Sequence, residues 1–273
     1  MSTALEILVD GKACSEGWPL DRALQYGDGL FETLLARKGR IRFEALHADR
    51  LARGCDRLAI HADPESIWSQ ARRAAARHGE ALLKLQLTRG DATLRGYAPS
   101  GTERARLILS VFPAPRASEL PAQIQVVTCP HILGENPALA GIKHCNRLEQ
   151  VLARASIAKT GAFEGVTASS SGCVISGTMS NVFMELDGEL VTPKLDRCGI
   201  EGVLRAVVLR EAAIVGMPVR TGDFPMSALT RCTGLALSNA RLGLLQAHWL
   251  DGRKLQGSDR LHDLAARIEA LEE

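Results

Sequence analysis

One lysine stands at the head of a segment whose residue types could do chemistry. Residues 141 to 153 read GIKHCNRLEQVLA, in which Lys143 is followed at once by histidine, asparagine and arginine. The preceding NPALAG carries no charge. A lysine that enters an apolar pocket has a lowered pKa and can attack a carbonyl carbon. The segment alone leaves two interpretations of Lys143, a reactive amine or a solvated surface charge.

The composition favours a small-molecule enzyme over a nucleic-acid-binding protein. With 273 residues, 46% of them hydrophobic, the chain can bury a sizeable core. Its 33 basic and 31 acidic residues give a net charge of +2, which provides no broad positive field for phosphates. The seven cysteines are scattered without a C-x-x-C pair, which predicts a reducing cytoplasm. Histidines and cysteines lack metal-ligand spacing, so no metal site is expected, nor is a targeting or membrane-spanning segment.

The elements that must position these residues divide into two halves. In residues 1–113, strand patterns alternate with two stretches of helical spacing, one of them after the expected cap Asp63. Residues 114–122 are rich in Pro, Ala and Ser and predict a linker. Residues 123–273 again mix strands and helices, so we expect a larger second domain that contains Lys143. The fold class predicted is therefore α/β (α+β) in two domains.

Seven motifs, taken in order, resemble one enzyme family. The Lys143 segment, I-K-H-x-N-R-L-E-Q-V-L-A-R, is similar to the active-lysine segment of aminodeoxychorismate lyases, which are fold-type IV enzymes that use pyridoxal phosphate. The other matches, from the N-terminus, are DRALQYGDGLFET, HADRL, TRGDATLRGY, GTMSNVF, RCGIEGVLR and LSNA. The likeness covers nearly the whole chain. It implies two α/β domains with pyridoxal 5'-phosphate in the cleft between them.

The resemblance also implies roles for individual residues. Lys143 would bond covalently to the cofactor and move protons on and off the substrate. Arg50, in HADRL, would bind the cofactor phosphate, a task that suits its planar fork. The backbone N–H groups of Val203 and Leu204, where a helix begins, would bind the same phosphate together with the Ser238 hydroxyl. Asn146 would lie near the phenolic oxygen of the cofactor.

One position departs from the family pattern. Relatives usually carry glutamate where this chain has Ser176, and that carboxylate keeps the pyridine nitrogen of the cofactor protonated. A serine hydroxyl can instead donate to an unprotonated nitrogen, which weakens the electron sink. Three explanations stay open: a tolerated variant of the lyase, an altered specificity, or an engineered or inactive chain.

The family reaction defines what else the site needs. The lyase splits 4-amino-4-deoxychorismate into 4-aminobenzoate and pyruvate, for folate synthesis, and this substrate carries two carboxylates. Arg95, Tyr97, Asn239 and Arg241 are the candidates for binding it, because relatives use these loops near the substrate. Relatives are homodimers. Two alternatives remain, a fold-type IV transaminase for D-amino or branched-chain acids and a member that binds a ligand without turnover.

Overall fold

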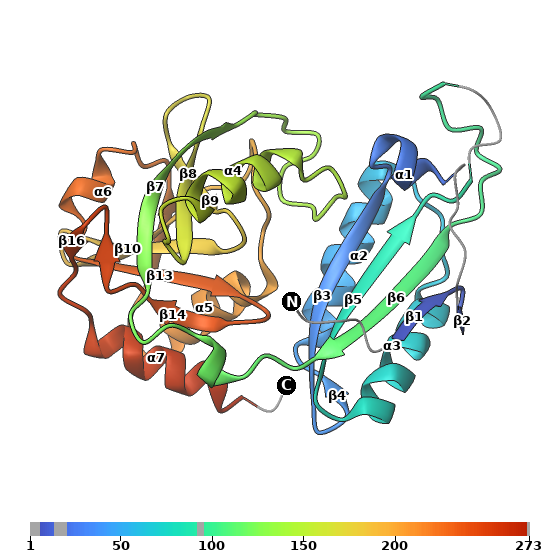
Figure 1. The fold of residues 1–273 in the computed structure, drawn as a ribbon, viewed down its shortest axis with the longest axis horizontal. Helices are drawn as coiled ribbons and strands as arrows, with labels where there is room; N and C mark the ends of the chain where they lie inside the picture. The colour runs from blue at the N-terminus through green and yellow to red at the C-terminus, as the bar shows by residue number, and fades with distance from the viewer. Residues whose placement is uncertain (1–5, 14–20, 92–95, 272–273) are drawn as a thin grey trace. The chain divides into compact units, whose positions relative to one another are not determined.

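The computed structural model describes residues 6–13, 21–91 and 96–271. The chain divides into two units. The first unit comprises the chain up to Arg116 together with Ile142–Asn146, and the second comprises Ala117–Gly141 and the chain from Arg147 onward. Both units mix strands with helices, so the predicted α/β (α+β) class is confirmed (Figure 1).

The first unit is built on a six-stranded antiparallel sheet in the order β2-β1-β6-β5-β3-β4. Its central strands are long and apolar, and residues 38 and 39 turn the chain between β3 and β4 with positive φ angles of 50° and 74°. Such a turn matches the twist of a hairpin. The strands are β1 (Glu6–Val9), β2 (Lys12–Ala13), β3 (Gly29–Arg37), β4 (Arg40–Ile41), β5 (Ala81–Thr88) and β6 (Arg106–Pro113).

Helices cover one face of this sheet. They are α2 (Glu44–Leu58), which packs on β3, and α3 (Pro64–His78), which packs on β4, β5 and β6; the short helix α1 (Arg22–Tyr26) precedes β3 in the chain. Helix α3 begins as predicted, with Asp63 accepting a hydrogen bond from the Glu65 amide and Pro64 in the first turn. On β3 the even-numbered residues point to α2, because a Cβ at Gly54 of α2 would meet the Leu30 side chain at 2.7 Å. Side chains alternate along a strand, so Phe31 and Thr33 lie on the opposite face.

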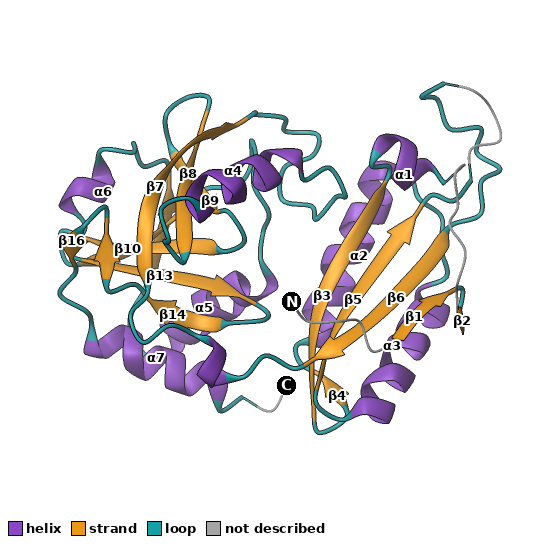
Figure 2. Ribbon diagram, in the orientation of Figure 1, coloured by secondary structure: helices purple, strands orange, loops and turns teal. Residues whose placement is uncertain are grey.

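The second unit contains two five-stranded sheets (Figure 2). One has the order β12-β11-β10-β13-β14 and the other β16-β15-β7-β8-β9. Buried residues from both sheets, among them Val126, Val166, Val182 and Leu237, form one apolar core. The strands are β7 (Gln125–Leu133), β8 (Glu164–Ser169), β9 (Val174–Gly177), β10 (Asn181–Leu186), β11 (Glu189–Pro193), β12 (Val219–Gly222), β13 (Gly234–Asn239), β14 (Gly243–Gln246), β15 (Trp249–Leu250) and β16 (Arg253–Lys254).

Four α-helices and a short 3-10 helix complete the described part of the second unit. They are η1 (Ala117–Glu119), α4 (Leu148–Ala158), α5 (Val203–Ile214), α6 (Ala228–Arg231) and α7 (Asp259–Glu269). Helix α4 packs on β7 and β8, and α5 packs on α7 and β13. Helix α5 presents nearly continuous apolar residues, and seven of its side chains are buried.

Lys143 lies in the first unit, whereas the sequence predicted it in the second domain. The break between the units, after Arg116, falls inside the predicted linker 114–122, but Lys143 belongs to the first unit and not to the second. The reason is backbone pairing between the lysine segment and β3, described below, which no local pattern could reveal.

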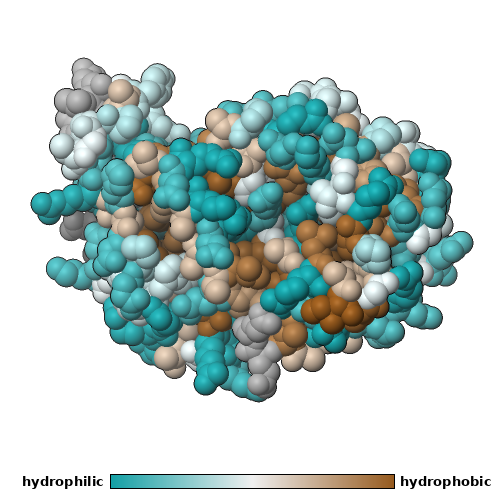
Figure 3. Space-filling view, turned by 180° about the vertical axis from the view of Figure 1, so that it is seen from behind, coloured by the Kyte–Doolittle hydropathy of each residue, from teal (hydrophilic) through white to brown (hydrophobic). Residues whose placement is uncertain are grey.

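The face drawn in Figure 3 carries many hydrophilic side chains together with patches of hydrophobic ones. Among the described residues, no helix is both long and apolar enough to span a membrane.

Candidate active site

Lys143 lies on a short stretch of chain that runs antiparallel to the start of β3. The Phe31 amide donates to the Lys143 carbonyl at 2.9 Å, the Cys145 amide donates to the Gly29 carbonyl at 2.9 Å, and Leu30 pairs with His144. These contacts fix the backbone on both sides of the lysine. The side chain is half-buried, and Nζ lies 4.3 Å from the centroid of the Phe31 ring. An aromatic face attracts an ammonium group, so Phe31 helps to hold Lys143 in place.

Arg50, the expected phosphate ligand, is buried in a charge cluster on the other face of β3. Its Nε donates to Glu32 Oε1 at 2.8 Å, and its Nη2 donates to Glu32 Oε2. His47 Nδ1 lies 2.6 Å from the same Oε2. Arg50 and His47 come from successive turns of α2, and Glu32 comes from β3. The bidentate contact orients the guanidinium firmly.

The pKa values in this cluster follow from burial and charge. Burial opposes ionisation of Glu32, which is 1% exposed, but Arg50 and His47 outweigh it and lower the pKa of Glu32 to about 2. Burial also lowers the pKa of His47, and the attraction of Glu32 does not offset it. Glu32 is therefore a carboxylate at neutral pH that balances the charge of Arg50.

The second unit brings Ser238 and the start of α5 to one place. Asn181, on β10, pairs with Ser238 on β13, and its side-chain amide donates to the Ile200 carbonyl at 2.8 Å. A Cβ at Gly202 would lie 2.0 Å from Asn181 Oδ1, so only glycine fits there. Asn181 thus holds the loop before α5 against the strand end that carries Ser238.

The end of β13 and the start of α5 carry hydrogen-bond donors that have no acceptor among the described residues. Gly202 precedes α5 without a side-chain cap, so the first amides of the helix, from Val203 on, stay available. Ser238 is 1% exposed, and within the described chain its hydroxyl has no hydrogen-bond partner. A buried polar group without a partner is costly, and a helix N-terminus attracts anions. The arrangement suits a phosphate group.

The residue two positions before Lys143 is hydrogen-bonded to the loop that precedes α5. Gly141, two residues before Lys143, donates to the Gly199 carbonyl at 3.0 Å and accepts from the Glu201 amide at 3.0 Å. Both partners belong to the loop that ends at Gly202. Gly141 has a φ of 81°, which favours glycine.

Ser176 lies on β9 and is nearly buried. Its hydroxyl donates to the Gly177 carbonyl at 2.8 Å, and its own carbonyl accepts from Thr167 Oγ1 at 2.9 Å. A serine hydroxyl has one proton, so the oxygen lone pairs remain as its free hydrogen-bonding capacity. In this rotamer Ser176 can accept from a protonated nitrogen, whereas donation to an unprotonated one requires the hydroxyl to turn.

A buried carboxylate close to Ser176 does not take the place of the missing glutamate. Glu164, on β8, is fully buried and accepts hydrogen bonds from the backbone amides of Thr178 and Met179 and from the Ser180 hydroxyl, at 3.0, 3.2 and 2.9 Å. The Gly165 amide and the Thr178 hydroxyl bind it as well. Glu164 therefore holds the turn of the GTMSN motif. The last residue of this motif is Asn181.

The remaining candidates are spread over loops. Asn146 is exposed and donates to the Gly27 carbonyl at 3.1 Å. Asn239 uses its side chain locally, accepting from the Arg241 and Leu242 amides and donating to the Met179 carbonyl. Arg241 is exposed and lies 4.0 Å from Glu119. Arg95 lies outside the described residues.

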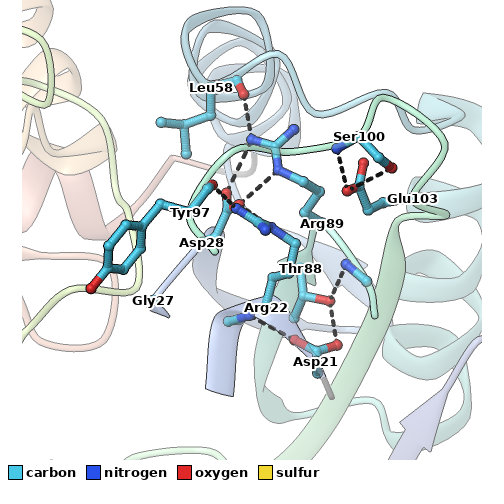
Figure 4. Close-up of polar contacts among 12 residues, drawn as sticks. Asp21, Arg22, Gly27, Asp28, Leu58, Thr88, Arg89, Tyr97, Ser100 and Glu103 are labelled. Atoms are coloured by element: carbon cyan, nitrogen blue, oxygen red, sulfur yellow. Dashed lines mark hydrogen bonds and ion pairs between the residues drawn. The ribbon is translucent and has the colours of Figure 1, made fainter. Parts of the chain in front are cut away.

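Tyr97 is part of a structural network in the first unit. Its ring is 83% exposed and packs edge-on against Tyr26, and its carbonyl accepts from Arg22 at 2.6 Å. Figure 4 shows Arg22 and Arg89 converging on Asp28, at 2.8 and 2.7 Å. Burial alone would raise the pKa of Asp28, but the two arginines have the larger effect, so the pKa of Asp28 is lower than its ordinary value. Arg89 also donates to the carbonyls at the end of α2, so it braces the turn.

Sequence reasoning missed four residues that shape these clusters, namely Glu32, His47, Glu164 and Asn181. A signal did exist for Glu32, because an acidic residue inside the apolar strand L-F-E-T-L-L must be paired if it is buried.

Comparison with known proteins decides the family. The family described as amino-transferase class IV matches residues 29–248. The chain belongs to this family. Two lyases are similar to this member along most of its length. The aminodeoxychorismate lyase of Vibrio harveyi is 35% identical over 82% of this chain and 83% of its own. The crystal structure of 4-amino-4-deoxychorismate lyase from Pseudomonas aeruginosa is 38% identical, with a TM-score of 0.91, over 98% of this chain and 100% of its own.

A third relative combines two activities in its name. The bifunctional aminodeoxychorismate lyase / D-amino acid transaminase of Mycobacterium tuberculosis is 25% identical over 97% of both chains. The relatives of this chain are thus named for both reactions, the lyase and the transaminase.

The residues of this class IV member fit pyridoxal 5'-phosphate. In the first unit, the half-buried Lys143 carries an amine of the kind that such a cofactor would need. In the second unit, the donors around Ser238 lack an acceptor among the described residues, as a phosphate site would require. The same arrangement would be costly in a protein that bound no anion.

Proposed function

We propose that this chain is an aminodeoxychorismate lyase that uses pyridoxal 5'-phosphate. It divides 4-amino-4-deoxychorismate into 4-aminobenzoate and pyruvate, in folate synthesis. The observation that carries the proposal is likeness to lyases at 35% and 38% identity over most of both chains. Lys143, held beside Phe31 by backbone pairing, is in keeping with it.

Lys143 moves the proton in this reaction. When bound, the cofactor withdraws electrons from the ring carbon that bears the substrate amine. Lys143 Nζ takes the proton from that carbon, and the bond from the adjacent carbon to the enolpyruvyl oxygen breaks. The six-membered ring becomes aromatic, and the departing enolate of pyruvate gains one proton, which balances the proton taken from the ring carbon. Atoms balance without water or an oxidant, so the protein has to supply only binding, orientation and a proton carrier.

The cofactor phosphate is bound by Val203, Leu204, Ser238 and Arg50 in this proposal. The neutral donors of the second unit suit it, because they lack an acceptor of their own. Arg50 contributes charge, and Glu32 keeps its guanidinium oriented. Asn146 serves the phenolic oxygen.

Ser176 is compatible with a lyase. Formation of an aromatic ring supplies much of the driving force, so strong electron withdrawal by a protonated pyridine ring is needed less than in transamination. The local contacts of Ser176 also leave its oxygen lone pairs available. The loop residues Arg95, Tyr97, Asn239 and Arg241 remain candidates for contact with the substrate.

The protein acts as a cytoplasmic homodimer in this proposal. Helix α4 exposes an apolar stripe on one side, where Leu148, Val151 and Leu152 are 77%, 59% and 55% exposed. Residues three and four apart share a helix face. A stripe of this kind favours burial against a second copy, which sedimentation at several concentrations tests.

The test of the function is an assay of the purified chain with pyridoxal 5'-phosphate and enzymatically generated 4-amino-4-deoxychorismate. We expect 4-aminobenzoate and pyruvate in equal amounts. Incubation with D-alanine or branched-chain amino acids and a keto acid distinguishes the transaminase, which the bifunctional relative makes the leading alternative. Amino-group transfer without 4-aminobenzoate would overturn the proposal.

A further inference from the structure

The turn before β3 holds the segment that carries Lys143 through two backbone carbonyls. The Gly29 carbonyl accepts from the Cys145 amide at 2.9 Å, and the Gly27 carbonyl accepts from the Asn146 side chain at 3.1 Å. Gly27 has a φ of 69°, and a Cβ there would lie 2.3 Å from Asn146 Oδ1, so the contact needs glycine. The turn therefore fixes the backbone on the C-terminal side of the lysine.

Asp28 is the middle residue of this turn, and its carboxylate binds two arginines (Figure 4). Arg22 Nε donates to Oδ2 at 2.8 Å, while Arg89 donates to Oδ2 from Nε at 2.7 Å and to Oδ1 from Nη2 at 3.1 Å. The same two residues bind the Asp28 backbone, because its amide donates to the Arg22 carbonyl at 3.3 Å and its carbonyl accepts from the Arg89 amide at 3.1 Å. Side chain and backbone of Asp28 are thus both held in one orientation.

The Asp28 carboxylate is also the countercharge for both arginines. Among the described residues, neither Arg22 nor Arg89 pairs with another carboxylate. Both guanidinium groups are largely buried, so solvent screens their charges only weakly. If Asp28 were neutral, two neighbouring cations would repel each other with no negative charge between them. The conformation of the turn therefore depends on this one carboxylate.

Arg89 fastens the turn to a helix as well. It donates to the carbonyls of Leu58 and Ala59 at 2.6 and 2.8 Å, where α2 ends. The same helix carries Arg50. The turn is thus fixed to α2 through Asp28 and Arg89, and its own carbonyls hold the lysine segment.

We propose that Asp28 is a positioning residue for Lys143. By pairing with Arg22 and Arg89, it keeps the turn in the conformation whose carbonyls hold the lysine segment against β3, with Nζ over the Phe31 ring. The inference rests on the proposed function, in which Lys143 carries the proton. Asp28 contacts neither substrate nor cofactor and acts through the backbone. A misplacement of about 1 Å can slow a reaction roughly 100-fold, so the position of this amine matters for the rate.

Hydrogen exchange tests the inference independently of turnover. The Phe31 amide donates to the Lys143 carbonyl and the Cys145 amide donates to the Gly29 carbonyl, so both amides report on the pairing. In the full chain, with and without pyridoxal 5'-phosphate, we expect Asp28→Asn to speed exchange at both amides by about 10- to 100-fold. Amides in the middle of β5 should keep their protection. An equal loss of protection along β5 would show a merely structural role and overturn the inference.

Matched variants separate this contact from ion pairs in general. Glu65 also binds one arginine, Arg72, with both carboxylate oxygens at 3.0 Å, but on the surface of α3, so Glu65→Gln should leave both amides unchanged. Asp28→Glu keeps the charge and should retain more protection than Asp28→Asn. If Asp28→Asn does not fold, Arg22→Gln replaces it. Arg89 then keeps its two hydrogen bonds to Asp28, so we expect a smaller increase in exchange at the same amides.

Turnover distinguishes this inference from the proposed function. Asp28→Asn should lower kcat for 4-amino-4-deoxychorismate by about 10- to 100-fold and change KM by less than about 3-fold, because positioning affects the proton transfer and not substrate binding. If the native chain makes 4-aminobenzoate and Asp28→Asn leaves either kcat or the exchange of the two amides unchanged, the role of Asp28 is refuted and the lyase stands. If the native chain makes no 4-aminobenzoate, the lyase proposal fails, and exchange at Phe31 and Cys145 still decides whether Asp28 positions the lysine segment.

Discussion

The two units handle their buried polar groups in opposite ways. In the first unit, Arg50 is buried but has a carboxylate partner in Glu32, which has a second contact with His47. In the second unit, Ser238 is buried with no partner in the described chain, and α5 begins without a side-chain cap. A satisfied cluster stabilises the fold, whereas unsatisfied donors lower stability until an anion binds.

This difference shows which kind of buried polar group indicates a ligand site. Charge is a poor guide, because the more strongly charged cluster is largely satisfied by the protein itself. The neutral donors around Ser238 indicate a phosphate more directly than Arg50 does.

The largest expected effect is on the satisfied cluster. Glu32→Gln removes the carboxylate charge that pairs with the buried Arg50, so we expect the free energy of unfolding to fall by about 3–5 kcal/mol. Urea denaturation measures it. Glu189→Gln is the matched control, because Glu189 pairs with Arg220 at the surface and should cost less than about 1 kcal/mol. Equal losses in both variants would contradict the contrast between the units.

Acid should weaken the same cluster. The pKa of Glu32 is lowered from 4.5 to about 2 in the folded chain, so the unfolded chain binds more protons between these values. Stability from Glu32 is present above pH 4.5 and is lost as pH falls toward 2, by an order of 3 kcal/mol. Over this range the free energy of unfolding should decrease more steeply with falling pH in the native chain than in Glu32→Gln. Parallel pH curves would show that the pair is not ionised as described.

A smaller effect is expected at the unsatisfied donors. Ser238→Ala removes a buried hydroxyl that has no partner in the described chain, so it should raise the stability of the cofactor-free protein by about 1 kcal/mol, yet weaken pyridoxal 5'-phosphate binding by about 10-fold. Pyridoxal, which lacks the phosphate, should bind both proteins alike. Thr192→Val is the control, since the Thr192 hydroxyl already donates to the Val182 carbonyl at 2.8 Å and its loss should lower stability alone. An equal loss of pyridoxal binding in Ser238→Ala would place the hydroxyl away from the phosphate.

The smallest effect is expected at Ser176. Because aromatisation drives the proposed reaction, Ser176→Glu should change lyase turnover by less than about 10-fold, or ~1.4 kcal/mol in the barrier. Transaminase activity, which depends more on the protonated ring, should gain more. Steady-state assays of both reactions on the same preparation measure this. A lyase gain of several orders of magnitude would show that serine does not suffice.

Local features of the fold could be predicted from the sequence. The Asp63 cap, the hairpin turn at Lys38 and Gly39, and helices α2 and α3 follow from neighbouring residues alone. The hairpin of β1 and β2 is less evident, because its turn depends on the positive φ angles of Asp10 and Gly11. Strand β8, EGVTAS, has little apolar pattern although all six residues are buried.

The site depends on pairings between distant parts of the chain. The Lys143 segment pairs with β3 more than a hundred residues earlier, and Glu32 meets Arg50 across a strand and a helix. No local rule specifies such partners. The motifs indicated Lys143, Arg50 and Ser238, but their roles remain predictions.

The central claim is that Lys143 carries the lyase reaction, and one measurement tests it most directly. Native chain and Lys143→Ala, each incubated with pyridoxal 5'-phosphate, are compared for 4-aminobenzoate formation from 4-amino-4-deoxychorismate. We predict product from the native chain only, while Lys143→Ala stays folded and retains cofactor through the phosphate donors of the second unit. Product from Lys143→Ala at a rate near that of the native chain would contradict the account.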